Sequence, residues 1–126
     1  MYFIIIFAGG GIGSVLRYLT VLFVQNISQK SLYLSSYHSI IVVNFIGCLI
    51  YAAILITLKK TNIFNEYIKA FIFTGLLASY TTFSTFVFET YDLFFKQGLT
   101  IAIKYFLLSL ISSFVGFYLI YQLHEK

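Results

Sequence analysis

The chain has 126 residues, of which 60% are hydrophobic and only 10% are charged. Soluble proteins carry about 25% charged residues, so this composition and the mean hydropathy of +0.95 exclude an ordinary soluble domain. The length leaves room for a single domain. The formal net charge of +4 is modest, and we expect the basic loops to face lipid headgroups and no nucleic acid to bind.

Four stretches are long and apolar enough to cross a membrane as helices, which takes about 20 residues each. They cover approximately Tyr2–Val24, Tyr37–Leu58, Tyr67–Phe95 and Leu99–Leu123. The first stretch lacks a basic region before its apolar core and contains Arg17, so we interpret it as a permanent span and not as a cleaved signal peptide. The sequence therefore predicts an all-α integral membrane protein of the cell membrane, with one four-helix domain over residues 1–126.

Basic residues are divided almost evenly between the two sides of the predicted membrane domain. The positive-inside rule orients a protein only through a clear excess of Lys and Arg on one side. Here the excess is weak, and we expect the chain to insert in both orientations. One side would carry Lys59, Lys60, Lys69 and Lys126, and the other Lys30 and Lys96 with Lys104 close by.

The first two spans contain small and polar residues with two possible roles each. Gly9 and Gly13 stand four residues apart on one helix face, where another backbone can approach closely. Arg17, near the end of the first span, either extends its side chain to the interface or anchors helix ends. Asn44, in the middle of the second span, either joins two helices or donates hydrogen bonds to an anion.

The third span contains the most unusual segment of the chain, from Gly75 to Phe86. Hydrocarbon offers polar groups no partners, so its hydroxyls must face protein or a water-filled pathway. The chain has no proline, and we expect Gly75 and the hydroxyls to interrupt the helix at Ala78–Thr81. A row of neutral donors without charge suits an anion that is held and then released. The five hydroxyl residues are Ser79, Thr81, Thr82, Ser84 and Thr85.

Aromatic rings and hydroxyls form further patterns in the second half of the chain. Phe83 and Phe86 stand three apart on one helix face, and the positive edge of an aromatic ring can contact an anion. Simple packing is the alternative, since the chain has 15 Phe. The fourth span carries one polar stripe, either a packing seam or part of a lined path, formed by Tyr105, Ser109, Ser113 and Gly116.

No pattern in the sequence indicates catalysis. Cys48 is the single cysteine, which excludes an intrachain disulfide and chemistry that needs a thiol pair. His38 and His124 have no second ligand at metal-binding spacing. Asp92 and Lys96 are spaced for an interfacial ion pair on one helix. We therefore expect a protein that is not an enzyme.

Three motifs together resemble the Fluc (CrcB-type) fluoride channels. The first two, Gly9-Gly10-x-x-Gly13-x-x-x-Arg17-Tyr18 and Val43-Asn44-x-x-Gly47, are loose patterns. The third is specific, and consists of Gly75 followed by Thr81-Thr82-Phe83-Ser84-Thr85-Phe86 and Glu89. The resemblance runs over essentially the whole chain, in the same order and with matching span lengths.

The resemblance implies a fluoride-selective channel that passively exports fluoride and so lowers its cytoplasmic concentration. It also implies an antiparallel, dual-topology homodimer with two narrow pores, a broken third helix and a central structural sodium ion, Na+. By position, the backbone carbonyls of Ala78 and Thr81 would hold the sodium, and Arg17 would anchor helix ends. The fluoride pore would be lined by Asn44, Phe83, Ser84, Thr85, Phe86, Tyr105, Ser109 and Ser113.

The chain departs from the family pattern at a few positions. Ala78 and Ser79 stand where glycines are usual, Ile40 replaces a small residue four positions before Asn44, and Ala52 replaces a later glycine.

Two other functions remain open at this point. A small four-helix drug/proton antiporter would need a membrane-embedded carboxylate. The first two spans have none, and Glu89 comes late in the third. A non-transporting membrane subunit would leave the polar stripes without a purpose.

Overall fold

The computed structural model describes residues 1–27, 35–61 and 65–125, and these are helical almost throughout. Four helical segments are long and apolar enough to span a membrane, which confirms the four predicted spans. Lys30 and Lys126, which entered the comparison of basic residues on the two sides, lie outside the described residues. The elements are α1 (Tyr2–Ile27), α2 (Ser35–Thr61), α3 (Glu66–Lys69), η1 (Ala70–Leu77), α4 (Ala78–Tyr80), α5 (Phe83–Gln97) and α6 (Leu99–Glu125).

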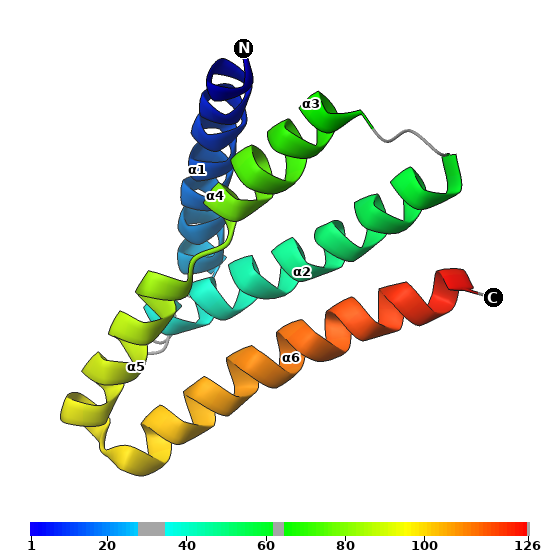
Figure 1. The fold of residues 1–126 in the computed structure, drawn as a ribbon. Helices are drawn as coiled ribbons and strands as arrows, with labels where there is room; N and C mark the ends of the chain where they lie inside the picture. The colour runs from blue at the N-terminus through cyan, green and yellow to red at the C-terminus, as the bar shows by residue number, and fades with distance from the viewer. Residues whose placement is uncertain (28–34, 62–64, 126) are drawn as a thin grey trace.

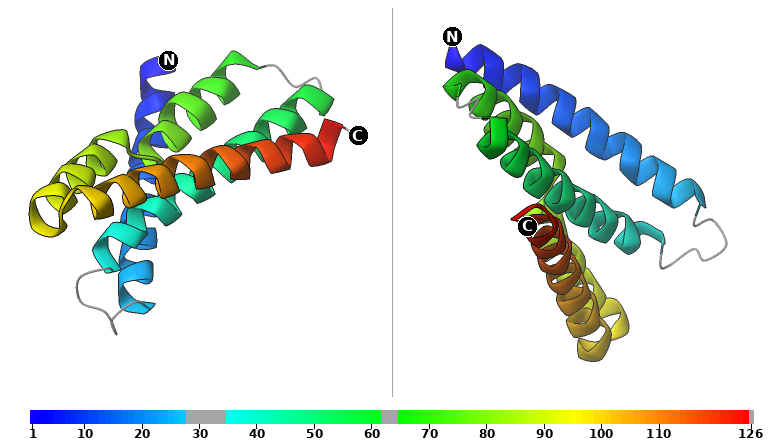
Figure 2. Two further views of the ribbon diagram at one scale, coloured as in Figure 1. Left: turned by 90° about the horizontal axis from the view of Figure 1, so that it is seen from below. Right: turned by 90° about the vertical axis from the view of Figure 1, so that its right-hand side faces the viewer.

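The helices form an open assembly in which α2 is central. On one side of α2 lies α1, which also packs against η1 and α4, and on the other lies α6, which also packs against α5 (Figures 1 and 2). Only 11% to 28% of the residues in the span windows are buried within the chain. Most apolar side chains therefore face outward, toward lipid or toward another protein surface.

Helix α1 meets η1 at very short range through glycines. A Cβ atom added at Gly13 would collide with the carbonyl of Leu76, and one added at Gly9 with the carbonyl oxygen of Phe71. Both glycines are buried. Missing side chains let two backbones pack closely in a membrane, so the packing role expected for this glycine pair agrees with the structure.

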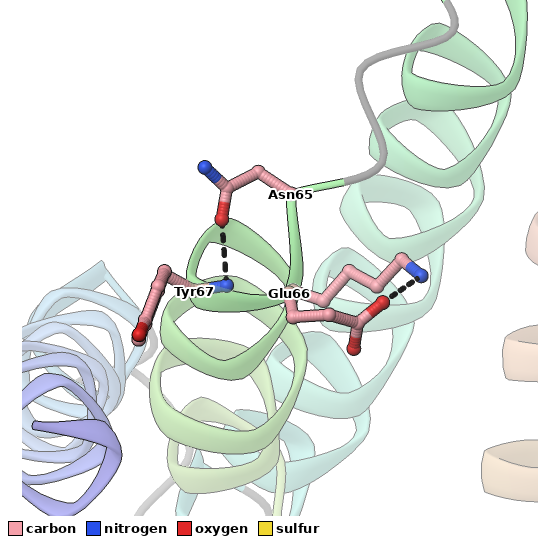
Figure 3. A network of polar contacts seen from close by, with 4 residues as sticks. Asn65, Glu66 and Tyr67 are labelled. Atoms are coloured by element: carbon pink, nitrogen blue, oxygen red, sulfur yellow. Dashed lines mark hydrogen bonds and ion pairs between the residues drawn. The ribbon is translucent and has the colours of Figure 1, made fainter.

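The start of the third span is fixed by a small polar network (Figure 3). Asn65 caps the helix, since its Oδ1 accepts a hydrogen bond from the backbone N–H of Tyr67 at 2.8 Å. Glu66 and Lys69 form an ion pair at 2.8 Å. The Tyr67 ring stacks on Tyr2 with centroids 4.6 Å apart. The cap and the stacked rings together align the beginnings of the first and third spans.

The helical path of the third segment changes direction between α4 and α5 (Figure 1). Thr81 and Thr82 have extended backbone, with φ/ψ of −76°/160° and −148°/117°. The interruption overlaps the expected Ala78–Thr81 only at Thr81 and extends one residue further, because Ala78–Tyr80 is helical. The physical reason is capping: Thr82 Oγ1 accepts the backbone N–H of Thr85 at 3.3 Å and so starts α5 at the next residue.

A tight turn at Gly98 joins α5 to α6. Gly98 has a φ of 91°, a conformation that favours glycine, and its N–H donates to the carbonyl of Phe94 at 3.1 Å. Two residues earlier, Lys96 pairs with Asp92 at 2.9 Å, which confirms that these two residues form an ion pair on one helix. The turn brings the end of the third span against the start of the fourth.

The glycine contact predicts a sharp difference between two alanine substitutions in α1. Gly13→Ala should lower the free energy of unfolding by about 1–3 kcal/mol, because the new methyl group has no room beside Leu76. Gly11→Ala is the matched control, since a Cβ there meets nothing within 4 Å. Unfolding in detergent, followed by circular dichroism, measures both. Equal stability of the two variants would contradict the close approach.

Candidate functional site

A cavity of about 450 Å³ lies where α4 gives way to α5. Its walls come from α2, η1, the extended Thr81–Thr82 link, α5 and α6, so residues from three spans meet there. None of the residues that the structure shows lining it is charged. Its polar groups are those of Asn44, Cys48, Thr81, Thr82, Ser109 and Ser113, with Tyr51 and four Phe rings around them.

Asn44 binds the interruption from both sides of its amide. Its Oδ1 accepts the backbone N–H of Thr82 at 2.9 Å, and its Nδ2 donates to the carbonyl of Thr82 at 3.2 Å. An asparagine amide has two N–H donors, so one remains available for another acceptor. The two roles considered for Asn44 from the sequence are therefore compatible: it joins two spans and still offers a donor beside the cavity.

The same bond changes the hydrogen bonding of the helix that precedes it. In a continuous helix the N–H of Thr82 would donate to the carbonyl of Ala78, but here it donates to Asn44. The carbonyl of Ala78 thereby loses its helical donor. The carbonyl of Thr81 accepts a long hydrogen bond, 3.4 Å, from Nη1 of Arg17. Arg17 of α1 thus contacts the residue that follows α4, a position that is compatible with the predicted role of anchoring a helix end.

Four hydroxyls of the third span, those of Thr81, Thr82, Ser84 and Thr85, lie at the cavity or in the cap of α5. Thr82 Oγ1 lies 2.9 Å from Thr85 Oγ1 and 3.4 Å from Ser84 Oγ, so three hydroxyls form one cluster. Thr81 Oγ1 donates to the carbonyl of Leu77 at 3.0 Å. Ser84 and Thr85, both predicted pore residues, are in the cap cluster and do not line the cavity in this single chain.

The two predicted aromatic residues lie next to each other in very different environments. Their ring centroids are 5.7 Å apart, and both line the cavity. Phe86 is 2% exposed, and its ring stacks with those of Tyr105 and Phe106 at centroid distances of 5.8 and 5.3 Å. Phe83 is 72% exposed. The structure therefore fixes the orientation of Phe86 and leaves Phe83 at the open side.

The polar stripe of α6 faces into the molecule. Ser109 and Ser113 line the cavity, and Tyr105 lies one turn before Ser109. The hydroxyl oxygen of Ser113 is buried and has no hydrogen-bond partner among the described residues. Tyr105, which does not line the cavity, donates its hydroxyl to Oε2 of Glu89 at 2.6 Å. Gly116 packs against the ring of Phe45.

Two contacts of this region were not foreseen from the sequence. One is the pair of Asn44 with the backbone of Thr82, and the other is Glu89 with Tyr105. A buried carboxylate requires a donor, so a search for donors on the neighbouring span would have suggested Tyr105. Ile40, one of the departures from the family pattern, is buried in the core cluster with Phe86 and Tyr105.

Fold and cavity together define a multi-pass membrane protein with a largely apolar cavity at an interruption of its third span, where the described lining residues offer several neutral polar groups and no charged side chain. A family model described as CrcB-like protein, Camphor Resistance (CrcB), matches residues 4–121. The chain belongs to this family, as its motifs suggested.

Curated relatives match most of the chain and share one name. A protein of Flavobacterium psychrophilum named fluoride-specific ion channel FluC is 40% identical over 101 residues, 80% of this chain and 78% of the relative. One of Azobacteroides pseudotrichonymphae with the same name is 35% identical over 118 residues, 93% and 90% of the two chains. Another, of Francisella philomiragia, is 31% identical over 130 residues, 97% and 96%.

The bonds of Asn44 predict that its loss destabilises the fold. Asn44→Leu leaves two backbone groups of Thr82 unsatisfied, at about 1–3 kcal/mol each, so unfolding should become easier by at least the lower value. Thr57→Val on the same helix is the control, because Thr57 is exposed and its hydroxyl donates to a carbonyl of its own helix, that of Ala53. Denaturant titration of the purified protein compares them. A Leu variant as stable as the control would show that the bonds carry no stability.

Proposed function

We propose that this protein is a fluoride-selective ion channel of the cell membrane that passively exports fluoride and lowers cytoplasmic fluoride. The observation that supports this most strongly is a largely apolar cavity within the membrane domain, whose described lining residues include several neutral hydrogen-bond donors and no charged side chain. The names of the relatives point to the same ion.

The cavity has the chemistry that a small anion requires. Fluoride is small and strongly hydrated, so it gives up water only where several donors replace it. Hydrogen bonds to charged groups contribute about 1.5–3 kcal/mol each, and here Asn44, Ser109 and Ser113 would share the task. A lysine or arginine in the path would hold the anion too tightly, whereas conduction needs weak, repeated sites.

The phenyl rings of Phe83 and Phe86 would supply positive edges between the hydroxyls. Near-parallel rings pack against Phe86, which leaves its edge as the part that can meet an ion in the cavity. Phe83 is exposed at the open side, where a second protein surface would complete the path. Ser84 and Thr85 would join the pore through their hydroxyl cluster with Thr82.

An antiparallel, dual-topology homodimer with a broken third helix is the assembly we propose. The open cavity, the exposed Phe83 and the small buried share of each span all favour a partner that covers this face. The weak difference in basic residues between the two sides favours insertion both ways. Extended backbone at Thr81 and Thr82 would be tolerated in the membrane because the partner buries it.

The assembly would also hold a structural sodium ion at the dimer centre, for which the carbonyl of Ala78 is the better-placed ligand and that of Thr81 is shared with Arg17. The carbonyl of Ala78 has lost its helical donor, and neutral oxygen atoms suit a hard cation. The carbonyl of Thr81 has one lone pair left beside its bond from Arg17. Two copies would supply two such pairs of carbonyls. When bound, the ion would coordinate carbonyl oxygens that the partner copy would shield from water.

The channel assignment predicts selective flux that depends on Phe83. Liposomes carrying the protein should release fluoride and retain chloride and a cationic drug, which separates a channel from a drug/proton antiporter. Phe83→Ile should slow fluoride release about tenfold or more, equivalent to about 1.4 kcal/mol in the barrier. Phe114→Ile is the control, since Phe114 is equally exposed, at 72%, but lies outside the cavity. Equal chloride release would overturn the assignment.

The proposed assembly predicts that sodium holds the dimer together. Replacing sodium with a bulky organic cation should shift the protein from dimer to monomer, or lower the temperature at which the dimer dissociates. Light scattering in detergent measures the change, with potassium as an intermediate case.

A C-terminal tag should also react with a membrane-impermeant label from both sides of a vesicle. Labelling from one side alone would contradict antiparallel pairing.

A further inference from the structure

Resting on the proposed function, we propose that Glu89 is a positioning residue. It controls the passage of fluoride by holding or releasing the hydroxyl group of Tyr105. In its charged form Glu89 holds the hydroxyl proton of Tyr105, and in its protonated form it releases that proton toward the path. Acidification would then open the channel further.

The geometry of the pair is tight and buried. Tyr105 on α6 donates to Oε2 of Glu89 on α5 over 2.6 Å, and the two residues are 6% and 7% exposed. The Tyr105 ring stacks on Phe86, which lies one turn before Glu89. Glu89 therefore holds by its carboxylate the same side chain that packs against a ring of the cavity.

Proton counting shows why the bond matters for an anion. A tyrosine has one hydroxyl proton, so the proton that Glu89 accepts is not available to fluoride at the same time. When Glu89 takes up a proton, its own O–H can donate to the Tyr105 oxygen, and the tyrosine proton is free to point elsewhere. Ser109, one turn further along α6, already lines the cavity. The freed donor would extend the row of donors by one position.

Electrostatics favour the same direction. A carboxylate beside the path repels an anion, and this repulsion is strong where water is scarce. Protonation of Glu89 removes that charge without moving any helix. The switch therefore needs only a proton and the rotation of one hydroxyl.

The neighbouring groups leave Tyr105 as the group through which Glu89 acts. On α5, Asp92 is engaged by Lys96 at 2.9 Å and by the hydroxyl of Tyr37 from α2 at 2.7 Å. Tyr37 also meets the ring of Tyr105 edge-on, with centroids 6.2 Å apart. Among the partly buried apolar residues that pack on the cluster of Phe86 and Tyr105, α1 contributes Val21. Asp92 is thus a second carboxylate close by, with its own partners.

The test measures fluoride release from liposomes between about pH 8 and about pH 5, because burial can raise the pKa of a carboxyl group by several units. Release from protein-free liposomes is subtracted, because HF crosses lipid unaided. Wild-type release should rise about tenfold as pH falls, the effect of about 1.4 kcal/mol on a barrier. Glu89→Gln should be fast and independent of pH, as if permanently protonated. Asp92→Asn, the matched control, should keep the wild-type slope.

Tyr105→Phe provides a second route to the answer. It removes the hydroxyl, so the rise in release on acidification should be clearly smaller than in the wild type, with only the loss of the Glu89 charge remaining, and this holds even if Glu89→Gln fails to assemble. Wild-type release that does not change with pH, or a Glu89→Gln slope equal to that of the wild type, would overturn the proposal. The absence of fluoride release from every variant would instead refute the channel assignment itself.

Discussion

The two hydrogen bonds between Asn44 and the backbone of Thr82 are the interaction on which the rest of the site depends. They satisfy the N–H and the carbonyl of an extended residue that hydrocarbon would leave unpaired. With those groups satisfied, the third segment can turn between α4 and α5 without exposing backbone. The turn gives Phe83, Phe86 and the Thr82 cluster their positions, and it releases the carbonyl of Ala78 from the helix ladder. One amide therefore connects the cavity, the cap and the proposed ion site.

A polar interruption needs rigid surroundings, and the glycine contact between α1 and η1 supplies them. The backbones approach so closely at Gly9 and Gly13 that the first half of the third segment has little freedom to slide. Arg17, one turn beyond Gly13, then reaches the carbonyl at the end of α4. Below the interruption, the Gly98 turn and the rings around Phe86 hold α5 against α6. The extended link at Thr81 and Thr82 is thus short and held at both ends.

The spans and the composition of the site were predictable from the sequence, but its connections were not. The hydropathy of a segment is the sum over its own residues, so the four spans could be predicted without knowledge of the tertiary structure. Asn44 and the hydroxyls were visible as groups too polar for lipid. Their partners depend on how α2 sits against the third segment, which no local pattern encodes. The extended residues lie later than expected because the cap formed by Thr82 and the hydrogen bonds of Asn44 determine where the helix ends and restarts. The partner of Asn44 is set by the tertiary structure. Glu89 was recognised as part of a motif, while its pairing with Tyr105 required the α5–α6 turn.

The wide turn of η1 has a consequence for how this chain tolerates changes in length. Residues Ala70–Leu77 form a π-helix, in which each residue advances the rotation less than in an α-helix because the hydrogen bonds span five residues. Every side chain after η1 is therefore rotated about the helix axis relative to an uninterrupted α-helix. The rotation places Leu76 against the glycines while Phe73 and Leu77 face the cavity. Loss of one residue here would restore ordinary pitch and carry Thr82 away from Asn44. The number of residues between the start of the third span and its interruption therefore sets which side chains face α1 and which face the cavity.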